Sequence, residues 1–150
     1  MKKIILPLLL FICISTATFA QDKYDPQLAE ELGADEYGMK KYIVAFLYRG
    51  NKVAEYSEEE RAKFQEGHMA NIGRLAQEGK MVLAGPFFGN EELRGLFFFD
   101  VESIEEAEAL TNTDPAIQAG ILKMDLKEWY GSATLGMLME MHEKVAKVIM

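Results

Sequence analysis

The sequence predicts an α+β domain of the ferredoxin-like type, with its elements in the order βαββαβ. Segments 41–48 and 93–99 are apolar at both alternating sets of positions, which is typical of central strands covered on both faces. Ser-x-x-Glu capping signatures beginning at Ser57 and Ser103 open helical segments between the strands. Segment 121–130 alternates apolar and charged residues, as an edge strand with one solvated face does. Together these elements form the split βαβ arrangement.

Residues 1–20 are expected to be a signal peptide rather than part of the fold. Two lysines precede an apolar run at 4–14, and Thr18 and Ala20 stand where signal peptidase cleaves. The run is shorter than the roughly 20 residues that a membrane span needs. We therefore expect a mature chain that begins near Gln21, is exported to the periplasm or secreted, and has no membrane association after cleavage.

Composition excludes several classes of function. The only cysteine, Cys13, lies in the expected leader, so the mature chain would have no disulfide, thiolate metal site or cysteine nucleophile. The net charge is −8, and loss of the two leader lysines brings it to −10. So acidic a surface repels phosphate backbones, and no nucleic-acid partner is expected. Without a phosphate loop, a nucleophile elbow or zinc spacing, the sequence predicts neither a cofactor nor a metal.

The first half of the mature chain is expected to contain a short helix, a strand, a long helix and a second strand. Residues 21–38 form an N-terminal extension, with Asp25-Pro26 as helix start and Gly33 as helix end. After strand 41–48, a helix runs from the Ser57 cap to Gly79, and Met81 to Ala84 reads as a buried strand closed by a Gly85-Pro86 turn.

The second half is expected to complete the domain, which we place at 39–131. Strand 93–99 leads to the helix capped by Ser103, whose Ile104, Ala107 and Leu110 face inward. Asp114-Pro115 starts one further helical turn before strand 121–130. Beyond the domain, 132–150 is a methionine-rich tail, and 135–150 reads as an amphipathic helix.

The predicted sheet has one face that its own helices cannot cover. Two helices cover one face of a four-stranded sheet, which leaves the other face exposed. That face would carry an alternating apolar set such as Tyr42, Val44, Phe46 and Tyr48. Because a large exposed apolar patch marks an interaction surface, we predict a homodimer built sheet against sheet.

His68 is the first candidate for chemistry. Phe64, His68, Ile72 and Leu75 follow each other by four, four and three residues, so the imidazole shares the apolar stripe of its helix. The sequence leaves two interpretations open: a core histidine bonded to a backbone carbonyl, or a general base. Gly67 weakens a helix interior, which favours a cavity beside the ring.

Asp114 is the second candidate, and it too has two interpretations. As the cap of a one-turn helix it needs no further explanation. A carboxylate that orients an imidazole also makes a general base, because it fixes the tautomer and stabilises the imidazolium.

The chain resembles the YCII-related domain family between Met39 and Tyr130. The resemblance rests on strand 39–48, the Gly67–Leu75 segment GHMANIGRL, the turn LAGPF at 83–87 and the run TDPAIQAG at 113–120. It implies a dimeric ferredoxin-like α+β barrel, related in architecture to muconolactone isomerases. Many members have no assigned activity, and a His-Asp pair is proposed as catalytic; the matching residues here are His68 and Asp114.

These observations lead to three hypotheses. The first is a small cofactor-free enzyme with lyase or isomerase chemistry on a small cyclic or aromatic metabolite, in which His68 moves a proton and Asp114 orients it. Its pocket would be edged by Tyr48, Gly85, Pro86 and Phe87. The second is a binding module that holds a small organic molecule without chemistry, and the third is an interaction protein that uses the methionine-rich tail.

Two further groups of residues could bind a metal or an anion. Met137, Met139, Met141 and His142 are soft ligands that suit Cu(I), but residues two apart do not share a helix face, and apolar packing is the favoured interpretation. Arg49, Arg74 and Arg94 are candidate anchors for an anionic substrate, or ordinary surface charges.

Overall fold

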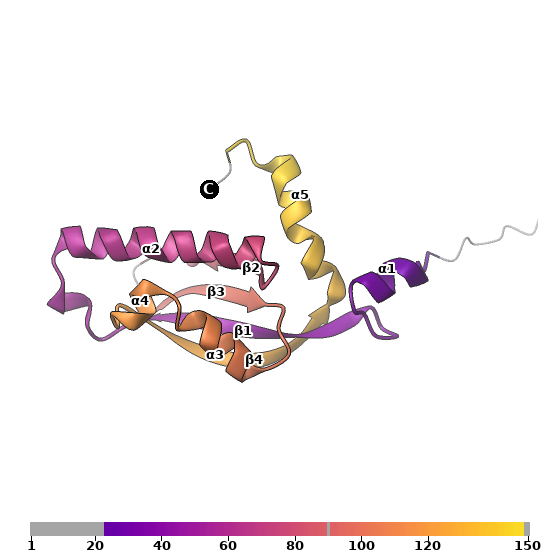
Figure 1. Ribbon diagram of the computed structural model, residues 1–150, viewed down its shortest axis with the longest axis horizontal. Helices are drawn as coiled ribbons and strands as arrows, with labels where there is room; N and C mark the ends of the chain where they lie inside the picture. The colour runs from indigo at the N-terminus through magenta and orange to yellow at the C-terminus, as the bar shows by residue number, and fades with distance from the viewer. Residues whose placement is uncertain (1–22, 90, 149–150) are drawn as a thin grey trace, which may run out of the picture.

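The structure is a computed structural model of the 150-residue chain, and it describes residues 23–89 and 91–148 (Figure 1). The expected signal peptide, residues 1–20, lies outside the described residues, as does the end of the tail at 149–150. No helix in the described part of the chain is long and apolar enough to cross a bilayer.

Four antiparallel strands form one sheet, and their order confirms the ferredoxin-like prediction. The strands are β1 (Met39–Arg49), β2 (Met81–Pro86), β3 (Leu93–Phe99) and β4 (Leu122–Ser132). Their order in the sheet is β2-β3-β1-β4. The two segments that are apolar on both faces are therefore the two central strands, as expected.

The helices lie between and around these strands. They are α1 (Pro26–Glu31), α2 (Glu58–Gln77), α3 (Ile104–Thr111), α4 (Pro115–Gln118) and α5 (Leu138–Val145), with 3-10 turns η1 (Val53–Glu55) and η2 (Ala133–Met137). Figure 1 shows α2, α3 and α4 on one side of the sheet, and α1 and α5 near the end where β1 begins.

The core lies between the sheet and the helix layer. Ile43, Ala45 and Leu47 of β1 pack with Phe97 and Phe99 of β3, and all are almost completely buried. Leu75 of α2 and Ala107 of α3 close this core from the helix side. Because side chains alternate along a strand, the same registers place Tyr42, Val44 and Phe98 on the opposite face.

Helix ends follow the expected capping chemistry, with one difference. Ser57 and Glu60 form a reciprocal capping box, and Asp25 caps α1 by accepting from two backbone N–H groups. Ser103 accepts from the Glu106 N–H at 3.2 Å, but the Glu106 carboxylate accepts from Lys80 and from the Glu102 N–H instead of completing a box.

Two further local predictions were wrong. Ile104 is 37% exposed rather than inward-facing, because it opens α3 at its first turn, before the helix reaches the core. Gly85 and Pro86 belong to β2 rather than to a turn after it. Because β2 is an edge strand, the missing N–H of proline costs no ladder hydrogen bond on its outer side.

The second face of the sheet is more covered than the sequence indicated. The Tyr42 hydroxyl donates to the carbonyls of Ser132 and Ala133 at 3.2 and 3.1 Å, which ties η2 to this face. Trp129 makes an edge-to-face contact with Phe98, at 5.2 Å between ring centroids. Tyr42 and Val44 are therefore buried within the chain itself, and the exposed apolar area is smaller than the alternating pattern suggested. The sheet-to-sheet homodimer stays a prediction.

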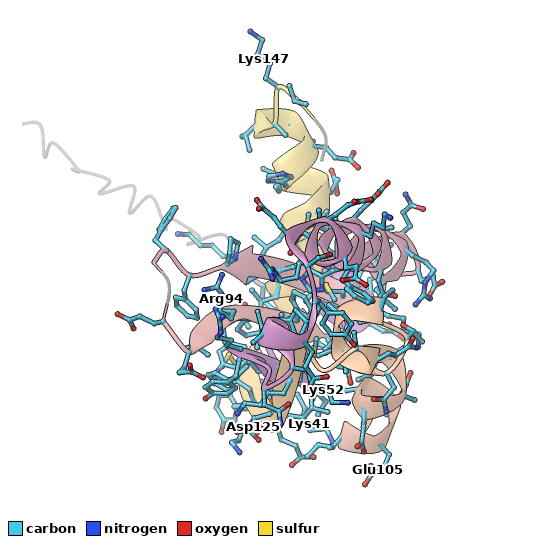
Figure 2. The ribbon with its side chains drawn as sticks, turned by 90° about the vertical axis from the view of Figure 1, so that its left-hand side faces the viewer. Lys41, Lys52, Arg94, Glu105, Asp125 and Lys147 are labelled. Atoms are coloured by element: carbon cyan, nitrogen blue, oxygen red, sulfur yellow. The ribbon has the colours of Figure 1, made fainter. Side chains whose placement is uncertain are left out.

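The tail does not form the continuous helix predicted for 135–150. It forms the 3-10 turn η2 and then α5, which ends at the Ala146 cap. The serine at 132 caps η2 through the Thr134 N–H, and this local hydrogen bond favours a turn over the α-helical ladder. Figure 2 shows α5 rising away from the sheet, with Lys147 beyond its end.

Candidate active site

His68 lies on the face of α2 that packs on the sheet. The residue is 7% exposed, and its ring stacks on Phe97 of β3 with centroids 5.8 Å apart and planes inclined by 25°. The four-four-three spacing of the α2 stripe is what directs the imidazole inward. A polar ring at this position requires a buried partner, because an unpaired buried polar group is costly.

That partner is Asp114, which is completely buried at the start of α4. Its Oδ2 lies 2.5 Å from His68 Nδ1, and its Oδ1 accepts from the Ala116 N–H at 2.8 Å. One carboxylate thus caps the helix and also pairs with the imidazole, as both interpretations of Asp114 require; its role in catalysis stays a prediction. The alternative in which a backbone carbonyl holds the histidine is wrong.

Gly67 explains how α4 comes close enough to α2 for this pair to form. A Cβ at Gly67 would lie 3.0 Å from Cγ of Pro115, the residue after Asp114. The missing side chain therefore accommodates the proline ring; the expected cavity beside His68 is present, but Gly67 does not line it. Nearby, Arg74 donates to Asn71 and Thr113, each at 2.8 Å, and this bridge fixes the chain just before Asp114.

The free nitrogen of His68 has the properties of a base. When the carboxylate is ionised and the imidazole neutral, Nδ1 donates to Asp114 and Nε2 keeps its lone pair, because an ionised carboxylate can only accept hydrogen bonds. Within the described part of the chain, the only hydrogen bond of the His68 ring is the one from Nδ1 to Asp114. No buried side-chain nitrogen or oxygen in that part lacks a hydrogen-bond partner, so the unpaired Nε2 is not one of the buried atoms. Nε2 is therefore accessible rather than sealed in the core.

His68 borders a cavity of about 450 Å³ between α2 and the sheet. The walls come from the four strands, α2, η1, α4 and the residue before β4. The lining is mainly apolar, and its members are Leu47, Arg49, Val53, Arg61, Gln65, His68, Met69, Ile72, Ala84, Gly85, Pro86, Arg94, Gly95, Phe97, Ala116, Ile121 and Leu122. A cavity of this size and character suits a small organic ligand.

Two of the four residues that were expected to edge the pocket line the cavity, and two do not. Gly85 and Pro86 line the cavity. Phe87, which follows β2 and is 46% exposed, does not line it. Tyr48 points to the other face of the sheet, where it lines a smaller depression with Lys123, because the neighbouring Leu47 takes the position toward the helices.

The arginines divide in a similar way. Arg49 and Arg94 line the cavity, whereas Arg74 pairs with Glu78 at 2.8 Å on the outer side of α2. Arg61 also lines the cavity and was not among the predicted anchors, although its spacing from His68 places it on the same helix stripe. Arg61, Gln65, His68 and Ile72 are separated by four, three and four residues, which places all four on one helix stripe.

The methionine-rich tail contains soft side chains that could bind a metal. Across residues 23–89 and 91–148, no group of three or more His, Cys, Asp or Glu side chains is arranged to hold an ion. Met139 and Met141 are exposed on α5, and Met137 ends η2.

Comparison with known proteins places this site in a family. The model of the YCII-related domain family matches residues 42–130, more than half of the chain. The chain belongs to the YCII-related domain family. The YCII-related region contains His68, Asp114 and every residue that lines the cavity, and it leaves out α1 and α5.

The chain is also similar to two known proteins. The "Uncharacterized protein YjpA" of Bacillus subtilis (strain 168) is 30% identical over 71 residues, which are 45% of this chain and 81% of that protein. A solved structure, 5-chloro-2-hydroxyhydroquinone dehydrochlorinase from Burkholderia phenoliruptrix AC1100 in complex with 2,5-dihydroxybenzoquinone, is similar at 17% identity and a TM-score of 0.45. That similarity covers 60% of this chain and 93% of the other. At this level it says nothing about the substrate of the present chain.

Proposed function

We propose that this protein is a small enzyme that transfers a proton on an organic substrate, with His68 as general base and Asp114 as its positioning residue. One observation carries the proposal: a buried carboxylate holds His68 Nδ1 at 2.5 Å while the ring borders a cavity large enough for a metabolite. A histidine with one nitrogen fixed and the other accessible is the arrangement that general-base catalysis requires.

The reaction class follows from what such a base can do. His68 Nε2 takes a proton from a carbon next to a carbonyl group, and the electron pair of the broken C–H bond moves to the carbonyl oxygen to give an enolate. In an isomerisation, the imidazolium returns the proton to another carbon of the same molecule. In an elimination, the electron pair instead expels a leaving group from the adjacent carbon. Neither route needs a redox partner, and we propose no cofactor.

Hydrogen–deuterium exchange tests the proton transfer without knowledge of the product. Small cyclic and aromatic keto compounds are incubated with the protein in D2O, and loss of the C–H signal beside the carbonyl is followed by NMR. A positioned base contributes about 10²- to 10⁴-fold in rate, so His68→Gln should slow exchange by that order. Wild-type exchange in the His68→Gln variant would reject the role of His68. Binding of these compounds without exchange in the wild-type protein would favour the ligand-binding module.

The proposal extends to location and assembly. The lysines and apolar run of residues 1–20 support export to the periplasm or the medium, which cell fractionation with N-terminal sequencing of the mature chain would test. The remaining apolar side chains on the second sheet face, which include Leu83 and Trp129 at 38% and 41% exposure, support a homodimer. Sedimentation as a monomer at micromolar concentration would reject it.

A further inference from the structure

We infer that the ligand of this cavity is a carboxylate-bearing organic anion, held by Arg49, Arg61 and Arg94 with its apolar part against the sheet. This inference names the substrate class of the proposed enzyme. Its catalytic meaning therefore rests on the proposed function, although the binding itself does not.

The charge of the cavity is opposite to that of the chain. The whole sequence has a net charge of −8. Among the described residues that line the cavity, however, three are arginines and none is an aspartate or glutamate. Asp114 lies behind the imidazole and is not part of the wall. A positively charged cavity within an acidic protein attracts anions, although the rest of the surface repels them.

The three arginines converge from separate parts of the fold. Arg49 ends β1, Arg61 lies in the first turns of α2, and Arg94 is near the start of β3. These elements meet at one end of the molecule, which faces the viewer in Figure 2, where Arg94 is labelled. Since three elements distant in sequence bring the same charge to one cavity, the fold assembles a cationic site there.

The guanidinium of Arg61 is held in place without being neutralised. Its Nη1 donates to the carbonyl oxygen of Tyr56 at 2.5 Å, which fixes the side chain but provides no opposite charge. Tyr56 is in turn anchored by an edge-to-face contact with Phe64. Within the described residues, neither Arg49 nor Arg61 forms a salt bridge, whereas Arg74 on the outer side of α2 pairs with Glu78. Arg49 and Arg61 thus keep N–H groups available for a ligand.

Guanidinium groups select carboxylates by shape as well as charge. The planar fork of an arginine matches the two oxygens of a carboxylate and forms two parallel hydrogen bonds. The walls around these groups include Leu47, Ile72 and Phe97, and low local polarity strengthens charge pairing. An organic acid with a ring or short apolar body can therefore place its carboxylate at the arginines while the ring or chain reaches His68.

Binding of a matched pair of probes tests this inference. Calorimetry compares benzoate with benzamide, which has nearly the same shape and no charge. Because charge-assisted bonds are about twice as strong as neutral ones, we expect benzoate to bind at least about tenfold more tightly to the wild-type protein. Arg49→Gln, Arg61→Gln and Arg94→Gln should each weaken benzoate binding more than benzamide binding, and so reduce the preference for benzoate.

Lys63→Gln is the matched control. Lys63 lies in α2 two residues after Arg61, but its side chain is 71% exposed and pairs with Glu59 outside the cavity. Its replacement removes the same charge from the same helix, so benzoate binding should not change. Equal weakening of benzoate binding by Lys63→Gln and Arg61→Gln would show a general charge effect and overturn the cationic site. Equal affinity of the wild-type protein for benzoate and benzamide would also overturn it.

The His68→Gln variant separates this inference from the proposed enzyme. It should keep the preference for benzoate over benzamide, because the arginines remain, and lose the exchange activity. Retained exchange on neutral compounds, together with failure of benzoate to bind, would overturn the anion site and leave the base in place. Normal benzoate selectivity in a protein without exchange activity would support the anion site and reject the enzyme.

Discussion

Asp114 joins two elements through its two carboxylate oxygens: Oδ2 lies 2.5 Å from Nδ1 of His68 in α2, and Oδ1 accepts from the Ala116 N–H of α4 at 2.8 Å. The start of α4 is therefore fixed relative to the imidazole by one residue. The helix cap and the contact with the imidazole are made here by different atoms of the same side chain.

Two substitutions of Asp114 should separate these roles. Asparagine is as good a helix cap as aspartate, so Asp114→Asn should keep most of the stability. The side-chain NH2 group of asparagine can donate to His68 Nδ1, however, so that Nε2 carries the ring proton and has no lone pair for the substrate. Exchange activity should therefore fall by about 10²- to 10⁴-fold. Asp114→Ala should also lose about 0.5–2 kcal/mol of unfolding free energy with the cap. Urea unfolding and the exchange assay measure both effects; a fully active Asp114→Asn variant would contradict this account.

Two glycines of α2 provide a matched test of helix approach. Gly73→Ala has nothing within 4 Å of the new Cβ and should stabilise the protein by about 0.5–1 kcal/mol, since alanine is the better helix former. Gly67→Ala makes the same gain in helix propensity but places Cβ 3.0 Å from Pro115 Cγ, which should displace α4 and Asp114. We expect smaller stabilisation or a loss, and slower exchange. Equal stability and activity of the two variants would show that the Gly67–Pro115 approach does not hold the pair.

Tyr42 should make stability depend on alkaline pH. Burial, and then the charge of Asp100, raise the pKa of Tyr42 to about 12, whereas a tyrosine in an unfolded chain ionises near pH 10, about its reference value. Between these values the unfolded state binds fewer protons than the folded state, so stability falls as pH rises.

Replacing Tyr42 by phenylalanine removes both this dependence and the hydrogen bonds to Ser132 and Ala133. At pH 8 the variant should be less stable by about 0.5–1.5 kcal/mol, and the difference from the wild-type protein should shrink between pH 10 and 12. Urea unfolding at pH 8, 10 and 11 measures it. A difference that stays constant with pH would contradict the raised pKa.

The second sheet face can be tested with two apolar residues of similar exposure. Leu83 of β2 is 38% exposed and pairs in register with Phe98, whereas Ile104 of α3 is 37% exposed in the helix layer. A buried unpaired charge opposes association, so Leu83→Asp should dissociate the predicted homodimer and Ile104→Asp should not. Sedimentation of both variants at the same concentration decides; a dimer that withstands Leu83→Asp would place the interface elsewhere.

The sequence by itself determined the elements and their order. Both alternating sets of positions in β1 and β3 are apolar, so these strands need cover on both faces, and this indicated that they lie at the centre of the sheet. Ser57 and Gly79 set the ends of α2, and the spacing of Phe64, His68, Ile72 and Leu75 turned the imidazole inward. These features are local, because hydrogen bonding and helix or strand periodicity act within a few residues.

Only the tertiary structure decided what meets at the site. His68 and Asp114 are 46 residues apart in sequence, and their contact depends on the close approach of Gly67 and Pro115, which no local pattern shows. The same holds for Arg61, which joins Arg49 and Arg94 at one cavity, and for Tyr48, which the strand alternation sends to the other face. Contacts between distant segments depend on how helix and sheet surfaces pack, and packing is a property of the assembled fold rather than of any one segment.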